Sequence, residues 1–239
     1  MLEKIKIEDV LFLDVETVRL KEHFKDLNLH GKKIWEEKTI LQRSQETSPS
    51  EHYRKKAGVM AEFSKIICIS VGYLFIEKEV RCFRIKSFYG DDEKQILSDF
   101  AHLLNSKFNK QKYRLCAHNG KEFDFPFIAR RTLINQIKLP KILDLANKKP
   151  WQINHLDTME LWRFGDFKNY TSIKLLAELF NIPTPKDDIE GGDVGNIYYQ
   201  KKDFERIKNY CQKDTLTVAQ LLLRYKGEKL INEENIEFI

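Results

Sequence analysis

An apolar run that leads directly into two carboxylates is the feature that most constrains this chain. Residues 10–13 are all apolar, and Asp14 and Glu16 follow with one residue between them. An unbroken apolar run predicts a strand that is buried on both faces. Because side chains alternate along a strand, the two carboxylates point the same way, roughly 6–7 Å apart. A divalent cation would offset their repulsion and desolvation, but the same pair could also be solvated where the strand simply ends.

The composition suits an ordinary folded domain. The chain has 239 residues, of which 42% are apolar, enough for one generous domain or two small ones. The 41 basic and 36 acidic residues give a net charge of +5. That charge permits a nucleic-acid partner without requiring one, because the basic residues are spread along the chain.

The cysteines predict a reducing environment. Cys68, Cys82, Cys116 and Cys211 are not in CxxC spacing, and three lie in apolar, strand-like segments. We interpret them as reduced core residues of a cytoplasmic protein. No basic segment followed by an apolar one begins the chain, and no apolar run is long enough to span a membrane, so we expect neither a signal peptide nor a membrane partner.

Strand and helix patterns predict an α/β fold. Alternating or continuous apolar segments predict strands at residues 10–17, 66–75, 80–85, 113–117 and 152–156. Helical spacing appears in residues 92–104, 124–135, 172–180, 194–199 and 203–225. A hairpin followed by alternating strands and helices predicts a mixed five-stranded sheet with helices on both faces.

One domain accounts for nearly all of this pattern. We assign it to residues 1–226. A helical insertion at about 20–62, broken at Ser48-Pro49-Ser50, has too few apolar residues for a core of its own. Residues 227–239 are polar and are expected to form a peripheral tail.

A further carboxylate follows the fourth predicted strand. Asp124 lies two residues before Pro126, where a helix is predicted to begin. Asp is a favoured N-cap and Pro a favoured first-turn residue, so a structural role explains this spacing. The positive end of the helix would also keep Asp124 ionised, as a metal ligand must be.

The last helix carries a tyrosine and an aspartate one turn apart. Tyr210 and Asp214 share a face with Ile207 and Val218, which should point toward the core. A hydroxyl–carboxylate pair at the rim of the core would explain them structurally. An aspartate that faces a core is otherwise unfavourable unless something compensates its charge.

Together, these three places predict a metal site. Asp14, Glu16, Asp124 and Asp214 lie on elements that could converge above the sheet. Four carboxylates without His or Cys favour Mg²⁺ or Mn²⁺ over zinc. Two such ions about 3.5–4 Å apart form a clamp for phosphoryl displacement. Tyr210 would orient the attacking water by a hydrogen bond, since its ordinary pKa near 10 makes it an unlikely base.

These motifs resemble those of a known family. Asp14-Val15-Glu16-Thr17, Asn119 through Phe123-Asp124, and Tyr210-xxx-Asp214 are similar to the three motifs of DEDDy 3′–5′ exonucleases. That family lies in the DnaQ-like branch of the ribonuclease-H-like fold. The form of the second motif is closest to the stand-alone relatives of family B DNA polymerase proofreading domains. The resemblance covers roughly residues 8 to 225.

The resemblance implies an activity and residue roles. It implies a ribonuclease-H-like sheet, two divalent cations and release of nucleoside 5′-monophosphates from a 3′ end, which we expect to be single-stranded DNA. Asp14, Glu16, Asp124 and Asp214 would bind the metals. Thr17, Asn119 and Phe123 would contact the terminal nucleotide, although Phe123 could instead belong to the core. An exoribonuclease and a non-catalytic nucleic-acid-binding member are the alternatives, and no protein partner is indicated.

Other charged residues have less specific interpretations. Asp157 ends the fifth predicted strand, and we expect a structural pairing for it. Basic residues of the insertion could contact backbone phosphates or could form a solvated helix face. They are Lys21, Lys25, Lys32, Lys33, Arg54, Lys55 and Lys56. Arg130 and Arg131 present the same alternatives.

Overall fold

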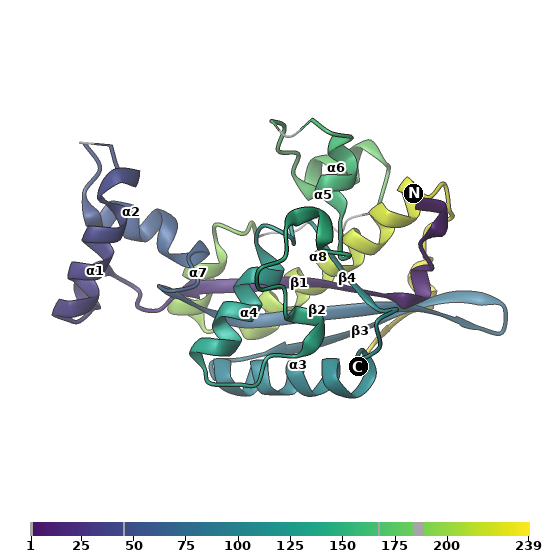
Figure 1. Cartoon of the computed structure of the whole chain (residues 1–239), viewed down its shortest axis with the longest axis horizontal. Helices are drawn as coiled ribbons and strands as arrows, with labels where there is room; N and C mark the ends of the chain where they lie inside the picture. The colour runs from purple at the N-terminus through teal and green to yellow at the C-terminus, as the bar shows by residue number, and fades with distance from the viewer. Residues whose placement is uncertain (1, 45, 167, 184–188) are drawn as a thin grey trace.

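A mixed sheet organises the molecule. The computed structural model describes residues 2–44, 46–166, 168–183 and 189–239. Over these residues the sheet has six strands in the order β5-β4-β1-β2-β3-β6 (Figure 1). The strands are β1 Val10–Arg19, β2 Ser64–Glu77, β3 Val80–Tyr89, β4 Arg114–Ala117, β5 Leu156–Asp157 and β6 Ile236–Phe238. The pairs β1–β2 and β2–β3 are antiparallel, whereas β1–β4, β4–β5 and β3–β6 are parallel.

Helices connect and cover the strands. The longer ones are α1 Leu29–Thr39, α2 Pro49–Lys56, α3 Glu93–Lys107, α4 Asp124–Ile134, α5 Thr158–Arg163, α6 Ile173–Leu179 and α8 Phe204–Tyr225. A short α7, Val194–Asn196, continues into a π-helical turn at Ile197–Lys201. None of the helices in the described ranges is long and apolar enough to span a membrane.

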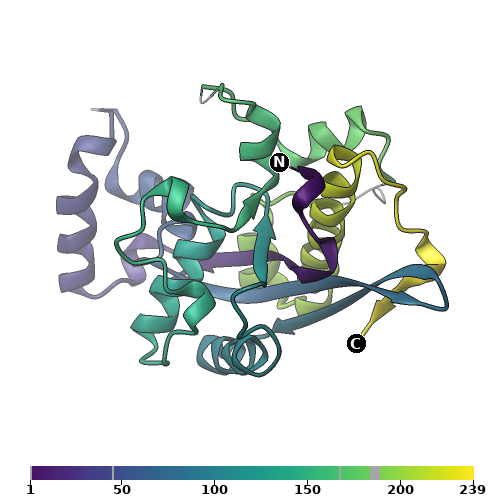
Figure 2. The ribbon, with the colours of Figure 1, turned by 45° about the vertical axis from the view of Figure 1, so that its right-hand side comes forward.

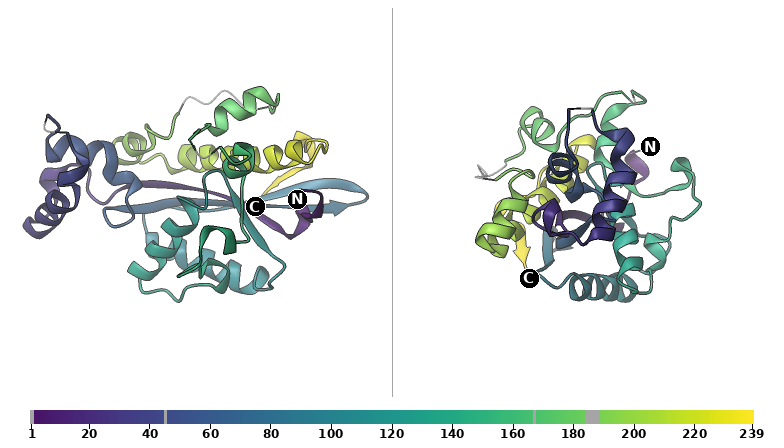
Figure 3. Two further views of the ribbon diagram at one scale, coloured as in Figure 1. Left: turned by 45° about the horizontal axis from the view of Figure 1, so that its top comes forward. Right: turned by 90° about the vertical axis from the view of Figure 1, so that its left-hand side faces the viewer.

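The two faces of β1 pack against different helices. Leu11 and Leu13 belong to a core cluster that includes Phe100 of α3. Phe12, between them, belongs to a second cluster that includes Val218 and further residues of α8. Figure 3 shows α3 and α4 below the sheet and α8 above it. The apolar run is therefore buried on both sides, as its sequence predicts, and the molecule is an α/β protein.

The fifth strand is shorter than predicted. Only Leu156 and Asp157 pair with β4, whereas the sequence pattern predicts a strand at 152–156. The segment Pro150–Gln152 forms a 3₁₀ turn instead. The ring of His155 then accepts a hydrogen bond from the backbone N–H of Leu115 at 3.2 Å. The His155 side chain thus accepts the hydrogen bond from Leu115 of β4 that the backbone of a longer β5 would otherwise accept.

The sheet has six strands and not the predicted five, because the C-terminal segment supplies β6. Ile236–Phe238 pairs in parallel with β3, and Arg84 contacts Glu237 at 2.6 Å. A three-residue strand within a polar segment has too little alternation to be recognised from sequence. Residues 227–239 are predicted to form a peripheral tail, but the last part of this segment, β6, is an edge strand of the sheet.

The insertion forms a small aromatic cluster together with Phe63, the residue that follows it, although its composition predicts no core of its own. Trp35 packs edge-on against Tyr53 and Phe63, with ring centroids 5.1 and 4.9 Å away. All three side chains are buried. A few large aromatic rings supply the apolar area that many small residues would otherwise provide. Figures 1 and 2 show α1 and α2 at the end of the molecule opposite the β2–β3 hairpin.

Candidate active site

The first two carboxylates lie where β1 becomes irregular. Asp14 is opposite Ser70 and Glu16 opposite Cys68 on β2, and the register shifts between Glu16 and Thr17. Bulges of this kind re-aim side chains and are frequent beside active sites. Glu16 is buried and Asp14 is partly buried. Their carboxylates lie on the same side of β1, as the alternation of a strand requires.

The third carboxylate begins α4. Asp124 is the first residue of the helix, Phe123 occupies the N-cap, and no side chain caps this end. Capping therefore does not explain Asp124. Asp124 is 3% exposed, and the backbone N–H groups of Asp124 itself and of Val15 act to lower the pKa of its carboxyl group. The helix start thus directs this aspartate toward β1.

The last helix brings the remaining pair. Tyr210 and Asp214 occur one turn apart on α8, between the buried residues Ile207 and Val218. The Tyr210 hydroxyl donates a hydrogen bond to Asp214. Cys211 follows Tyr210 directly. Its thiol donates a hydrogen bond to the backbone oxygen of Asp14 at 3.3 Å, and this bond joins α8 to β1 beside the carboxylates.

These four acids share one electrostatic environment. Burial raises the pKa of Asp14 well above its usual range, and the charges of Glu16, Asp214 and Asp124 raise it further. Burial likewise raises the pKa of Glu16, with Asp214 as the next cause. The pKa of Asp124 rises to about 8, mainly through burial. Carboxylates on β1, α4 and α8 are therefore close enough to oppose one another's ionisation.

The cluster fits a divalent cation. Oδ2 of Asp14 is buried and has no hydrogen-bond partner among the described residues. Ligand atoms of Asp14, Glu16 and Cys211 lie within 4.8 Å of one another. Burial keeps the pKa of the Cys211 thiol well above its ordinary value, so this thiol is a poor metal ligand. Hard carboxylate oxygens remain, and a buried group of them needs positive charge for all to be ionised.

Tyr210 remains protonated in this setting. Burial raises the pKa of its phenol, and the charges of Asp214, Glu16 and Asp14 raise it further. A phenol with a raised pKa does not act as a base at neutral pH. Its hydroxyl can still accept and donate hydrogen bonds and so orient a water molecule.

The three residues expected to contact substrate differ in their surroundings. The Thr17 hydroxyl donates to the backbone oxygen of Gly58 at 2.7 Å, which joins β1 to the insertion. Asn119 adopts a left-handed backbone with φ of 64°, and its buried Oδ1 has no partner among the described residues. Phe123 is partly buried and packs 5.1 Å from the ring of Phe127.

Asp157 has the structural role predicted for it. Its carboxylate caps α5 by accepting from the backbone N–H groups of Met159 and Glu160. It also accepts from the N–H groups of Asn119 and Lys121, at 3.0 and 3.1 Å. One side chain therefore holds together the start of α5 and the turn that leads to Asp124.

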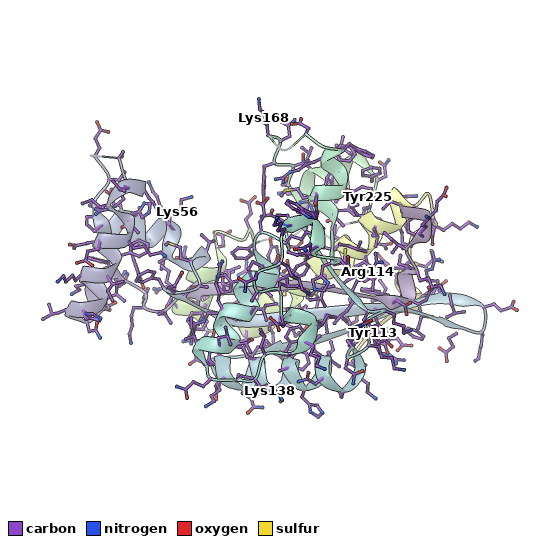
Figure 4. All side chains as sticks on the ribbon, in the orientation of Figure 1. Lys56, Tyr113, Arg114, Lys138, Lys168 and Tyr225 are labelled. Carbon is purple, nitrogen blue, oxygen red and sulfur yellow. The ribbon has the colours of Figure 1, made fainter. Side chains whose placement is uncertain are left out.

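Arg131 is a structural residue, so the phosphate-binding alternative for it is wrong. It is 5% exposed and pairs with the buried Glu93 at 2.5 Å. It also donates to the backbone oxygen of Ala61 at 2.8 Å. By contrast, most of the basic residues singled out in the insertion are exposed; they are Lys21, Lys25, Lys33, Arg54, Lys55 and Lys56. Figure 4 labels Lys56 on this part of the molecule.

His118 also belongs to this region, although no role is predicted for it from the sequence. One ring nitrogen lies 2.9 Å from the Thr158 hydroxyl, and the other lies 2.8 Å from the Thr171 oxygen. The histidine therefore connects the turn after β4 to segments forty and more residues away. The one sequence feature that could have indicated this role is that His118 directly precedes Asn119 of the second motif.

Comparison with known proteins identifies a family for this chain. A search of curated proteins gave no match. Residues 59–234 match the model of a family described as a predicted 3′–5′ exonuclease related to the exonuclease domain of PolB. The match contains Asp124, Tyr210 and Asp214, whereas Asp14 and Glu16 precede it. Because the match spans most of the chain, the protein belongs to this family of predicted 3′–5′ exonucleases.

Proposed function

We propose that this protein is a metal-dependent 3′–5′ exonuclease that hydrolyses the terminal phosphodiester bond of single-stranded DNA and releases nucleoside 5′-monophosphates. The observation that carries the proposal is the convergence of carboxylates from β1, α4 and α8. Two observations support it: the charges of Glu16, Asp214 and Asp124 raise the pKa of the buried Asp14, and Oδ2 of Asp14 has no partner among the described residues. The family match supports the direction of the reaction.

Each residue has a defined task in this proposal. Asp14, Glu16, Asp124 and Asp214 hold two Mg²⁺ or Mn²⁺ ions, which supply a more acidic water and stabilise charge on the departing 3′ oxygen. Tyr210 orients the attacking water through its hydroxyl oxygen, while the same hydroxyl donates a hydrogen bond to Asp214. Asn119 offers its unpaired Oδ1, and Phe123 offers a partly buried ring, to the terminal nucleotide.

The direct test follows digestion of a 5′-labelled single-stranded oligonucleotide with Mg²⁺ or Mn²⁺. Native protein should give a ladder that shortens from the 3′ end, with nucleoside 5′-monophosphates as the products. Asp14→Ala and Asp214→Ala should each remove this activity. A native protein that yields no ladder, or an Asp14→Ala variant with the native ladder, would contradict the proposal.

A matched variant guards against a contaminating nuclease. Asp144 is an exposed aspartate outside the carboxylate cluster. Asp144→Ala, expressed and purified in the same way, should keep native activity. Loss of activity in Asp14→Ala with retention in Asp144→Ala assigns the hydrolysis to this site.

Matched oligonucleotides of one sequence distinguish the alternatives. Faster digestion of RNA than DNA would make the protein an exoribonuclease, because selection between them depends on contacts to the 2′-hydroxyl. Binding of either strand without hydrolysis would indicate a non-catalytic member. The presence of all four carboxylates and Tyr210 supports catalysis over that alternative.

A further inference from the structure

A loop after α5 exposes two aromatic rings and a lysine. Phe164 is 89% exposed and Tyr170 is 68% exposed, and Lys168 between them is also exposed. Figure 4 shows Lys168 projecting from the molecule beyond this loop. Neither ring belongs to a core cluster among the described residues, so packing within the chain does not account for them.

Phe164 occupies a position that favours glycine. It follows the last residue of α5 with φ of 45° and ψ of 35°, in the left-handed region. Helices commonly end on such a residue, and glycine or asparagine is the usual occupant. A bulky residue with positive φ is strained, and strain of this kind is concentrated at ligand-binding sites. The exposed Phe164 side chain therefore strains the backbone, and no packing within the described residues offsets that strain.

Hydrogen bonds nevertheless hold the described residues of this loop. The Arg163 guanidinium donates to the backbone oxygen of Asn169 at 3.0 Å, which closes the loop across its base. Within it, the Asp166 carboxylate accepts from the backbone N–H of Lys168 at 3.1 Å. On α5, the ring of Trp162 stacks on Tyr225 of α8 at 6.3 Å between centroids. The aromatic residues are thus presented from a supported segment, which limits the entropy lost on binding.

This loop adjoins the candidate active site. The Thr171 oxygen at its end contacts His118, and Arg163 at its start lies 3.4 Å from Glu122. His118 and Glu122 flank the turn that contains Asn119 and leads to Asp124. A strand whose 3′ end reaches the carboxylates would therefore have its preceding nucleotides near the loop.

We propose that this aromatic loop, Phe164 with Lys168 and Tyr170, binds single-stranded DNA upstream of the scissile bond. The bases stack on the two rings, and Lys168 contacts a backbone phosphate. Stacking on aromatic side chains combined with cationic contacts is how proteins hold single strands without sequence preference. This inference rests on the proposed function and assigns to it a substrate-binding surface outside the carboxylate cluster.

The test compares a long and a minimal substrate. The long one is a ten-nucleotide oligothymidylate, and the minimal one is the p-nitrophenyl ester of thymidine 5′-monophosphate, which lacks upstream bases. Phe164→Gly combined with Tyr170→Leu should raise KM for the oligonucleotide on the order of 10- to 100-fold. Hydrolysis of the ester should be unchanged. The glycine should leave Tm unchanged or raised, because it relieves the left-handed strain.

Single variants separate stacking from bulk and charge. Tyr170→Phe keeps a ring and should keep the native KM, whereas Tyr170→Leu should not. Lys168→Ala should raise KM for the oligonucleotide and reduce its dependence on salt concentration. Phe238→Ala and Lys78→Ala are the controls, because β6 is the opposite edge strand from β5 and Lys78 lies in the β2–β3 turn. Both should behave as native protein.

The outcomes distinguish this inference from the proposed function. Native protein that hydrolyses neither substrate contradicts both. Native protein that hydrolyses both, with aromatic-loop variants that keep the native KM for the oligonucleotide, overturns the inference alone. Equal losses on the ester and the oligonucleotide would also overturn it, because the loop would then support the catalytic residues and not upstream bases.

Discussion

The acidic residues of the candidate site lie in surroundings that disfavour their ionised forms. Asp14, Glu16 and Asp124 all have raised pKa values because they are buried near one another. Such groups reduce stability when they must ionise without a counter-charge. Their burial therefore lowers the stability of the metal-free chain at neutral pH, and the proposed metal binding would offset that cost.

Removal of the Tyr210 hydroxyl should separate water orientation from metal binding. Tyr210→Phe is expected to lower kcat on the order of 10- to 100-fold, because the nucleophile loses its positioning hydrogen bond. Affinity for Mn²⁺, measured by titration calorimetry, should change little, since the four carboxylates remain. A large loss of Mn²⁺ affinity in this variant would contradict the role assigned to Tyr210.

The raised pKa of Asp124 predicts a pH-dependent stability. Asp124 has a pKa of about 8 in the folded protein and an ordinary value near 3.8 when unfolded. Between these values the folded state binds more protons, so the contribution of Asp124 to stability falls as pH rises from about 4 to about 8. In the metal-free protein, Asp124→Asn should therefore reduce the fall in the free energy of unfolding between about pH 4 and about pH 8.

Urea unfolding at pH 5 and pH 8 with a chelator measures this effect. The native protein should lose more free energy of unfolding between the two conditions than Asp124→Asn does. Adding Mn²⁺ at pH 8 should restore stability to native protein, because the bound cation favours the ionised carboxylates. Parallel pH profiles for the two proteins would contradict the assignment.

Among the elements, the turn from β4 to α4 depends on a residue outside it. Asp157 accepts backbone hydrogen bonds from Asn119 and Lys121 while it also caps α5. The aromatic loop after α5 and the turn before Asp124 are consequently connected through one carboxylate. Displacement of either element would be transmitted to the other.

Loss of the Asp157 carboxylate should therefore affect both stability and activity. Asp157→Ala is expected to lower the free energy of unfolding by about 2–4 kcal/mol, because a helix cap and two turn contacts are lost together. Asp92→Ala is the matched control, since Asp92 caps α3 through one bond to Gln95. It should cost about 1 kcal/mol and leave activity unchanged. Equal destabilisation in the two variants would contradict the bridging role.

For the whole molecule, β6 and the helical insertion lie at two different borders of the sheet. β6 covers the outer edge of β3 and adds the ion pair of Arg84 with Glu237. At the other end, the insertion follows directly from β1, and the Thr17 hydroxyl bonds to Gly58 within it. The sheet thus ends in β6 on the side away from the candidate site. The helical insertion lies next to the candidate site, because it follows the strand that carries Asp14 and Glu16.

Removal of β6 should expose that edge. A chain that ends at Asn235 is expected to lose roughly 1–3 kcal/mol of stability, through unpaired backbone groups on β3. It should also associate at high concentration, because exposed strand edges pair with one another. Size-exclusion chromatography and urea unfolding measure both effects. Glu237→Gln, which keeps the strand, should remain monodisperse; a monodisperse truncated chain would contradict the prediction.

Local patterns in the sequence determined much of this protein. The apolar run of β1, the helical spacing of α8 and the positions of the four carboxylates all follow from periodicity and charge, which are local properties. The aromatic core of the insertion, the pairing of β6, the shortened β5 and the Glu93–Arg131 pair were decided by tertiary structure. Each depends on contacts between distant segments, whose geometry no local pattern encodes. Tertiary structure likewise determines how three separate carboxylate motifs come to share one buried environment.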